Sequence, residues 1–249
     1  MSFSSTWGLW RSLAMYYGQP WKTGRMNRFY GQFVQPGDLC FDVGAHVGNR
    51  VRSWLGLGGT VVAIEPQPRM RQILERWYGR NDQVHIEAVG LSDQPGELTL
   101  HINTRNPTLT TFSKNWISDI EGETALPAAP WDDVVQVEVR TMDQLIETHG
   151  MPVFCKIDVE GFEDKVLAGL SSPVRALSFE AFPLDKERSI RCVRRLMELG
   201  DYRFRTVRAE SFRWVEEDWV TLEDIEASIL AQTLEDGSGD IYARLYTQS

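Results

Sequence analysis

Cysteine and histidine are both scarce in this sequence. Its 249 residues include 3 cysteines and 4 histidines. The cysteines (Cys40, Cys155 and Cys192) are too few and too widely spaced for a disulfide framework, and no histidine lies at metal-ligand spacing from another histidine or a cysteine. These absences exclude a disulfide-stabilised secreted domain and a zinc cluster, and we expect a reducing, cytoplasmic setting.

Long apolar runs and an excess of basic residues are absent as well. No stretch approaches the roughly 18 uninterrupted apolar residues that cross a bilayer. The N-terminal residues lack an apolar run followed by a small-residue cleavage site, so we interpret them as mature protein. Lysine and arginine total 26 against 35 aspartates and glutamates, a formal charge of −9. A net-acidic chain repels phosphate backbones, which argues against a nucleic-acid partner.

The composition is otherwise that of a globular protein, and segments typical of strands and helices alternate from residue 38 onward. Hydrophobic residues make up 42% of the chain and charged residues 24%. Continuous Val/Ile runs separated by helical stretches predict an α/β fold, with a parallel sheet covered by helices on both faces. The expected strands are residues 39–45, 61–66, 84–91, 153–161, 175–182, 202–207 and 240–246.

Two alternating segments interrupt this rhythm. Residues 97–103 and 134–139 alternate apolar and polar side chains, which predicts an inserted antiparallel pair at the edge of the sheet. The threonine-rich stretch between them is long and has no strong periodicity, so we expect a lid or acceptor-binding loop. The expected units are an N-terminal helical extension (1–36) and one main domain (37–249) that contains this loop (104–133) and an insertion (208–239).

A glycine-containing turn follows the first strand, in the run FDVGAHVGN. Glycine lets a ligand approach the backbone closely, and the helix that begins after this turn offers free amides. A dinucleotide site needs G-x-G-x-x-G, and here His46 and Asn49 occupy the second and third glycine positions. Asp42 stands two residues before Gly44. A carboxylate there would repel a pyrophosphate but suits the amino group of S-adenosylmethionine, so the spacing favours that cofactor.

The ends of the second and third strands complete a candidate adenosyl site. Glu65 ends the second strand, and its two carboxylate oxygens can accept both hydroxyls of a ribose. This feature serves NAD and S-adenosylmethionine equally. At the end of the third strand, Leu91 could pack on an adenine ring, and Ser92 or Asp93 could bind its exocyclic amine.

Three motifs together carry a family resemblance. The segments FDVGAHVGNRVRSW, VVAIEPQPRM and KIDVEGFEDKVLAGL resemble those of the FkbM-type methyltransferases, which are S-adenosylmethionine-dependent class I enzymes that mostly methylate hydroxyls of sugars and other natural products. The resemblance covers roughly residues 33–183, and KIDVEG with the following E-x-x-V-L-x-G is its most specific part. It implies a Rossmann-like sheet of seven mostly parallel strands, with the last strand antiparallel and helices on both faces.

The resemblance also implies roles for individual residues. Asp42, Gly44 and Gly48 would line the methionine end of the cofactor. Glu65 would hold the ribose, and Asp158 would lie beside the methyl group. The full set of expected cofactor-binding residues is Asp42, Gly44, Ala45, His46, Gly48, Asn49, Glu65, Pro66, Leu91, Ser92 and Asp158.

Two features of the chain depart from the family pattern. His46 stands where the family commonly has asparagine, and the insertion 208–239 has no counterpart that we recognise. In the family's strand order the first and fourth strands are neighbours, which implies that Cys40 and Cys155 are buried core thiols.

Methyl transfer to a hydroxyl needs a group that takes its proton, because a neutral hydroxyl is a poor nucleophile. Asp158 and Glu160 alternate along one strand and its end, Glu180 ends the next strand, and His46 has an unperturbed pKa suited to a base. The expected catalytic residues are therefore Asp158, Glu160, His46 and Glu180. The three carboxylates could bind Mg²⁺, but no D-x-D ligand pattern accompanies them, and no metal site is expected.

Several functional alternatives stay open at this point. We expect an O-methyltransferase acting on a small-molecule or glycan acceptor. The alternatives are a nicotinamide-dependent oxidoreductase, although the sequence has no Tyr-x-x-x-Lys pair for short-chain reductase chemistry, and a scaffold that binds S-adenosylmethionine without turnover. An N-methyltransferase lacks support because the N/D-P-P-Y tetrapeptide is absent. The aromatic N-terminal arm could serve as a lid or as a homodimer contact.

Overall fold

The main sheet of the protein has seven strands, as the sequence predicts. A computed structural model describes residues 20–122 and 131–246. The strand order is β3-β2-β1-β7-β8-β10-β9, and β10 runs antiparallel to both of its neighbours, β8 and β9. The strands are β1 (Leu39–Val43), β2 (Thr60–Ile64), β3 (Val84–Glu87), β7 (Phe154–Ile157), β8 (Ala176–Ala181), β9 (Tyr202–Arg208) and β10 (Gly239–Leu245). The predicted class I methyltransferase fold is thereby confirmed.

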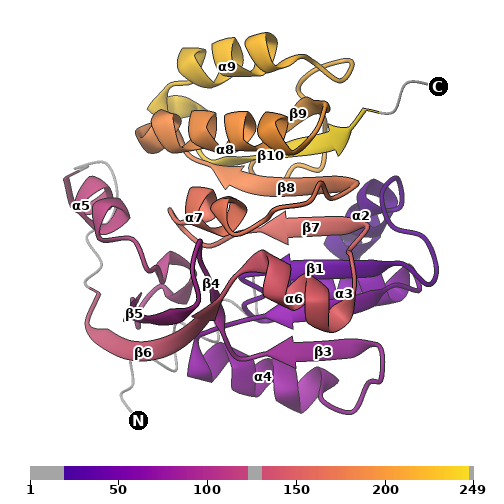
Figure 1. The fold of residues 1–249 in the computed structure, drawn as a ribbon, viewed down its shortest axis with the longest axis vertical. Coiled ribbons are helices and arrows are strands. Elements are labelled where there is room, and N and C mark those ends of the chain that lie inside the picture. Colours follow the sequence, from indigo (N-terminus) through magenta and orange to yellow (C-terminus); the bar gives the residue numbers. More distant parts are fainter. Residues whose placement is uncertain (1–19, 123–130, 247–249) are drawn as a thin grey trace.

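Helices cover both faces of this sheet (Figure 1), and its central strands β1 and β7 are therefore buried on both sides. Successive strand residues point to opposite faces, so Cys40 packs with α2 and α3, whereas Phe41 packs with α6 to α9. The helices are α2 (Pro20–Tyr30), α3 (Asn49–Gly56), α4 (Pro68–Tyr78), α6 (Met142–His149), α7 (Glu163–Ala168), α8 (Lys186–Leu199) and α9 (Leu222–Ala231). A capping box formed by Thr141 and Gln144 opens α6.

The inserted antiparallel pair is present, but it is not an edge of the main sheet. Strands β5 (Gly96–Ile102) and β6 (Asp133–Arg140) are antiparallel, and they form a separate three-stranded sheet with β4 (Gly90–Leu91). The predicted strand 84–91 is therefore divided: β3 belongs to the main sheet, and β4 pairs with β6. In Figure 1 the parallel strands of the main sheet point to the left, toward this second sheet.

The stretch 104–133 contains regular structure that the sequence analysis did not predict. It includes a short 3₁₀ helix (Pro107–Leu109) and α5 (Lys114–Gly122), and residues 123–130 lie outside the described part. Trp116 and Ile120 are buried at helical spacing, and the Trp116 ring packs edge-on against Phe182 with centroids 5.3 Å apart. Trp116 therefore has a packing role between α5 and the end of β8.

The structure also bears on the N-terminal arm, the three cysteines and the question of membrane-spanning helices. Residues 1–19 of the N-terminal arm lie outside the described residues. All three cysteines are free and buried, which agrees with the core position expected for Cys40 and Cys155. Among the described residues no helix is both long and apolar enough to cross a membrane.

Candidate active site

The turn after β1 packs tightly between the ends of two other strands. Gly44 has φ +82°, and its amide and that of Ala45 both donate to the carbonyl of Ile64, at 3.0 and 3.1 Å. A Cβ at Gly44 would lie 1.9 Å from the carbonyl oxygen of Asp158. Only glycine therefore fits at this point, where the ends of β1, β2 and β7 meet.

Glu65 follows β2 and is held in a fixed orientation by backbone amides. The amide of His46 donates to its Oε2 at 2.7 Å, and the amide of Gln67 donates to its Oε1 at 2.8 Å. Burial raises the pKa of Glu65 to about 7, against the lowering effect of these two bonds. Each carboxylate oxygen keeps a further lone pair, so Glu65 can accept two more hydrogen bonds from a neighbouring diol.

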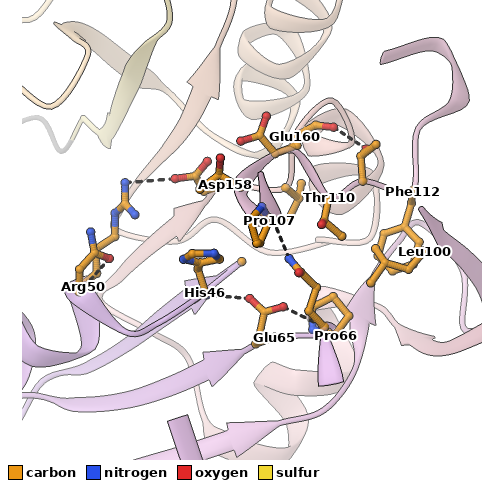
Figure 2. A pocket seen from close by; sticks show the side chains of 16 residues that line it. His46, Arg50, Glu65, Pro66, Leu100, Pro107, Thr110, Phe112, Asp158 and Glu160 are labelled. Carbon is orange, nitrogen blue, oxygen red and sulfur yellow. Dashed lines mark hydrogen bonds and ion pairs between the residues drawn. The ribbon is translucent and has the colours of Figure 1, made fainter. Parts of the chain in front are cut away.

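Gly44 and Glu65 border a cavity at the carboxyl ends of the parallel strands. This is the edge at which open α/β sheets bind ligands. Figure 2 shows its two ends: Arg50 and Asp158 lie on one side, Pro66, Leu100 and Phe112 lie on the other, and His46 and Glu65 lie between them. The lining residues are Gly44, His46, Asn49, Arg50, Glu65, Pro66, Gln67, Leu100, Pro107, Thr108, Thr110, Thr111, Phe112, Asp158, Val159 and Glu160.

The charged end rests on a buried network of ion pairs. Arg50 Nη2 lies 3.1 Å from Asp158 Oδ2, and Lys156 Nζ lies 3.5 Å from the same oxygen. Lys156 is fully buried and also donates to Asp240 Oδ1 at 2.7 Å. Burial disfavours the charged form of Asp158, but Lys156 and Arg50 outweigh this effect and hold its pKa below the ordinary value. Asp158 is therefore a carboxylate at neutral pH.

Three carboxyl groups converge beside this end. One oxygen each from Asp158, Glu160 and Glu180 lies within 4.8 Å of the others. Burial and the neighbouring Glu180 raise the pKa of Glu160 well above its usual value, and burial together with Asp158 and Glu163 raises the pKa of Glu180 to about 8. The group can therefore hold and release a proton near neutral pH.

A buried ion pair fixes the turn that carries Glu160. Glu163, the first residue of α7, accepts the amide hydrogen of Val159 at 3.1 Å, and its other oxygen lies 3.1 Å from Arg188 Nε. Glu163 and Arg188 are both fully buried. Glu160 has φ +53°, and its carbonyl accepts a hydrogen bond from the hydroxyl of Thr111. Contacts from two sides therefore hold this left-handed turn in place.

His46 lines the cavity but is a weak base there. Its backbone has φ +50°, a left-handed conformation that is uncommon outside glycine and that histidine, asparagine and aspartate adopt more often than other residues do. Burial lowers the pKa of His46 to about 4, so the imidazole is neutral at pH 7. Of the four expected catalytic residues, Glu160 and Glu180 therefore have the more favourable proton chemistry, because only their pKa values are raised.

Some of the expected site residues do not line this cavity. Asp42 is fully buried below it, and neither of its carboxylate oxygens has a hydrogen-bond partner among the described residues. Burial raises the pKa of Asp42 to about 6.

Gly48 has φ +79° and precedes α3 as its N-cap. Leu91 and Ser92 are buried in and just after β4, where Ser92 donates its amide to the carbonyl of Arg140. Ala45 and Glu180 are also absent from the lining.

Sequence reasoning missed several lining residues. Arg50 lies one residue beyond the glycine motif, and Leu100 lies in the inserted pair, where nothing in the local sequence distinguishes it from a core residue. Pro107, Thr110 and Phe112 fall in the threonine-rich stretch that we expected to be a lid or acceptor loop. Their positions depend on where the second sheet lies relative to the main sheet, which has no local sequence signal.

The comparison with protein-family models decides which family the chain belongs to. The model of the methyltransferase FkbM domain matches residues 42–204, which is more than half of the chain. The chain belongs to the FkbM methyltransferase family. The match includes the glycine turn, Glu65 and the KIDVEG motif, so the resemblance found in the sequence is confirmed. No curated protein matches the chain.

Solved methyltransferase structures are similar to this FkbM-family chain at low identity. They include an S-adenosylmethionine-dependent O-methyltransferase from Thermotoga maritima (13% identity over 95% of this chain and 71% of that one, TM-score 0.44). An O-methyltransferase from Bacillus cereus, in complex with S-adenosylhomocysteine, is 12% identical over 99% and 92% of the two chains (TM-score 0.45). A TehB-like methyltransferase from Corynebacterium glutamicum is 9% identical over 98% of each chain (TM-score 0.48).

Proposed function

We propose that this protein is an S-adenosylmethionine-dependent O-methyltransferase that acts on a hydroxyl of a sugar or natural-product acceptor. The observation that carries the proposal is the arrangement of the cavity in an FkbM methyltransferase domain. A fixed carboxylate, Glu65, lies between an apolar end and a charged end. This order matches a ligand with a flat base, a diol and a charged tail.

The methyl donor fits the cavity better than a dinucleotide does. We assign the adenine to the apolar end at Pro66, Leu100 and Phe112, and the ribose hydroxyls to Glu65. The sulfonium then lies near Asp158, whose negative charge attracts it. A nicotinamide dinucleotide would bring a pyrophosphate to the same carboxylates, and the G-x-G-x-x-G turn that holds a pyrophosphate is absent.

We assign the role of general base to the neighbouring pair of carboxyl groups of Glu160 and Glu180. In the reaction the acceptor oxygen forms a bond to the methyl carbon while the carbon–sulfur bond breaks, and the hydroxyl proton passes to a carboxylate. A base with a pKa near the working pH is the most effective. The pKa of Glu180 is raised to about 8, and an adjacent sulfonium would lower it toward neutrality by favouring the carboxylate. Donor binding would therefore prepare the base.

The acceptor region that we propose consists of the loop 104–133 and the insertion 208–239. A second cavity supports this assignment, since it lies at the ends of β8 and β9 on the same edge of the sheet. Residues of the insertion that line it include Arg208, Gln232 and Asp236, and Asp240 lies at its edge. Asp240 bonds Lys156, which connects this cavity with Asp158. Hydrogen-bonding side chains of this kind suit a hydroxylated acceptor, and the family resemblance is what favours a sugar or another natural product.

The proposal also covers the cellular compartment of the protein, the role of its N-terminal extension and its macromolecular partners. Three buried free thiols support a reducing, cytoplasmic compartment. The N-terminal extension 1–36 is proposed as a lid or homodimer element, and only its helix α2 lies within the described residues. We propose no nucleic-acid partner, since the net charge is −9.

Two measurements test the proposed function. Isothermal titration with S-adenosylmethionine, S-adenosylhomocysteine and NADH should give binding of the first two and none of NADH; the reverse pattern would identify an oxidoreductase. Transfer of a radiolabelled methyl group to a panel of sugars and polyols should then give a labelled ether. Binding with no transfer to any acceptor, including cell extract, would indicate a scaffold.

The same assay distinguishes a carboxylate base from a metal site. Two oxygen ligands about 2.1 Å from Mg²⁺ are at most about 4.2 Å apart, and one oxygen from each of the three carboxyl groups lies within 4.8 Å of the others, which is close to this limit. The proposed base predicts that transfer persists in EDTA, whereas loss of transfer that added Mg²⁺ restores would assign the cluster to a metal.

A further inference from the structure

The two helix layers that cover the main sheet differ in charge. Helices α2, α3 and α4 pack with Cys40 on one face of the sheet, and α6 to α9 cover the other face. There are two arginines in α2, two in α3 and three in α4, and these helices have one acidic residue, Glu75. Helices α6 to α9 contain nine acidic residues against six basic ones. A chain with a formal charge of −9 therefore has one strongly basic helix layer.

The arginines of the two layers also differ in their partners. All four arginines of α8 lie within 3.1 Å of a carboxylate oxygen, and these carboxylates belong to Glu163, Asp164, Glu226 and Glu198. In the basic layer Arg71 pairs with Glu75 at 3.2 Å. Five other arginines, in α2 and in or just after α4, form no ion pair with a described residue, and all of them but Arg69 are exposed: Arg25, Arg28, Arg69, Arg76 and Arg80. The charges of α8 are thus neutralised within the fold, whereas these five arginines form an uncompensated basic face.

We propose that this basic face binds the surface of a membrane that contains anionic lipids. The negative potential of such a surface attracts basic side chains, and each lysine or arginine strengthens binding by about fivefold. The acidic helices α6 to α9 lie behind the sheet, farther from the membrane than the ~10 Å diameter of one helix. Salt screens exposed charges beyond about 8 Å at physiological ionic strength. The basic face therefore decides the interaction, although the whole chain is acidic.

Aromatic side chains favour a lipid surface over a nucleic acid as the partner. Trp77 lies between Arg76 and Arg80 in the chain and is 42% exposed. Residues 1–19, which precede α2 in the sequence, contain Trp7, Trp10, two adjacent tyrosines and no acidic residue. Tryptophan and tyrosine are enriched where a protein meets lipid headgroups, and basic residues commonly accompany them there. A flat bilayer also contacts one side of the molecule only, which suits a basic charge that is confined to one helix layer.

Co-sedimentation of the full-length protein with lipid vesicles tests the proposal. One set of vesicles contains phosphatidylcholine alone, and the other contains equal parts of phosphatidylcholine and phosphatidylglycerol. The double variant Arg76→Gln/Arg80→Gln removes two charges from the basic face. Arg191→Gln/Arg194→Gln on α8 is the matched control, because it removes the same charge from two exposed arginines of the opposite layer. None of these arginines lines the cavity, so the measurement is independent of cofactor binding.

The expected result depends on the lipid charge and on the layer that is changed. The wild type should sediment with the anionic vesicles and not with phosphatidylcholine, and the bound fraction should fall as salt is added. Arg76→Gln/Arg80→Gln should weaken binding to the anionic vesicles by about 25-fold, which is about fivefold for each arginine. Arg191→Gln/Arg194→Gln should stay within about twofold of wild type, because its charges lie beyond the screening length. Thermal melting checks that each variant is folded, and Arg25→Gln/Arg28→Gln on α2 provides a second test of the face.

Three results would overturn the proposal, and each leaves the proposed function intact. The first is a wild type that does not bind anionic vesicles even at low salt. The second is an equal loss in the α4 and α8 double variants, which would show that net charge matters and this face does not. The third is tighter binding to a fluorescent single-stranded RNA than to vesicles, with a loss of RNA binding in Arg76→Gln/Arg80→Gln, which would assign the face to a nucleic acid.

Discussion

The two ends of the cavity are built in different ways. The charged end and the carboxylate of Glu65 next to it use residues at the ends of main-sheet strands, where Gly44 packs against Asp158 and Glu65 accepts two backbone amides. The apolar end uses side chains from the inserted segment, among them Leu100 of β5 and Phe112. The first end is thus fixed by backbone contacts and buried charges, and the second by the packing of a separate small sheet.

This difference separates two contributions to ligand recognition. Backbone turns and ion pairs set where the polar groups of a ligand must lie, and small changes there disturb several groups at once. Apolar side chains contribute area, and replacing one of them removes only its own contact. We therefore expect substitutions at the charged end to have larger and more selective effects than those at the apolar end.

Gly44→Ala should give the largest effect. The added Cβ would lie 1.9 Å from the backbone oxygen of Asp158, so the ends of β1 and β7 must separate. We expect a loss of S-adenosylhomocysteine affinity of about 100-fold or more and a lower melting temperature. Gly37→Ala is the control, because Gly37 has a similar φ of +87° and a Cβ there would meet nothing within 4 Å. Similar losses in both variants would mean that backbone strain, and not the contact with Asp158, is decisive.

Glu180→Gln should reduce the rate of methyl transfer without changing the affinity for S-adenosylhomocysteine, which carries no sulfonium charge. Removing a general base typically costs about 10²-fold or more in kcat. The pKa of Glu180 is raised to about 8, so the wild-type rate should increase with pH until the carboxyl group is ionised, and the variant should lose this limb. The measurement is a pH–rate profile with the acceptor found by the radiolabel screen. Glu187→Gln, an exposed position on α8, is the control. A full pH limb in Glu180→Gln would assign the base elsewhere.

Phe112→Ala should weaken adenosine binding by about tenfold, because stacking of a base on an aromatic ring contributes about 1–3 kcal/mol. Since this end contacts only the adenosine, the loss should be equal for S-adenosylhomocysteine and 5′-methylthioadenosine. Titration of both ligands makes this check. Val134→Ala is the control, because Val134 lies on β6 of the same small sheet and is exposed. A loss confined to S-adenosylhomocysteine would place the adenine at the other end.

Asp42→Asn should have the smallest effect on the cofactor and a visible effect on stability. We expect the affinity for S-adenosylhomocysteine to change by less than about threefold, because Asp42 lies outside the cavity lining. Its pKa is raised to about 6, so the folded state holds the proton more tightly than the unfolded state does. Wild-type stability is therefore lost as pH rises from about 4 to 6.

The asparagine variant should lack this contribution. Relative to wild type, its free energy of unfolding should rise by up to about 3 kcal/mol between pH 4 and pH 7, at about 1.4 kcal/mol per pKa unit. Urea unfolding at several pH values measures this difference. A difference between the two proteins that stays constant with pH would mean that folding does not raise the pKa of Asp42.

The same contrast explains how far the sequence could predict the site. Gly44, Glu65 and Asp158 were predicted because each follows a buried strand whose apolar run is visible, and parallel strands end at one edge of a sheet. The adjacency of the first and fourth expected strands came from the family resemblance, and β1 and β7 are neighbours in the structure. Asp42 shows the limit of motif spacing: the spacing gives its place in the chain, whereas its burial depends on the layers above and below it.

The apolar end could not be predicted in this way. The run 84–91 has a single apolar signal, yet its two parts join different sheets. The pairing of β5 with β6 was predicted, but no local pattern shows that these strands form a separate sheet with β4 and bring Leu100 to the cavity. Helix α5 was missed because a helix of 9 residues gives a weak periodic signal, although Trp116 and Ile120 are buried at the expected spacing.

A crystal structure of the protein with S-adenosylhomocysteine tests the central claim most directly. Our account predicts both ribose hydroxyls within hydrogen-bond distance of Glu65, the adenine against Leu100 and Phe112, and the sulfur on the side of Asp158. A ligand bound with its ribose away from Glu65, or with its ends exchanged, would contradict the account.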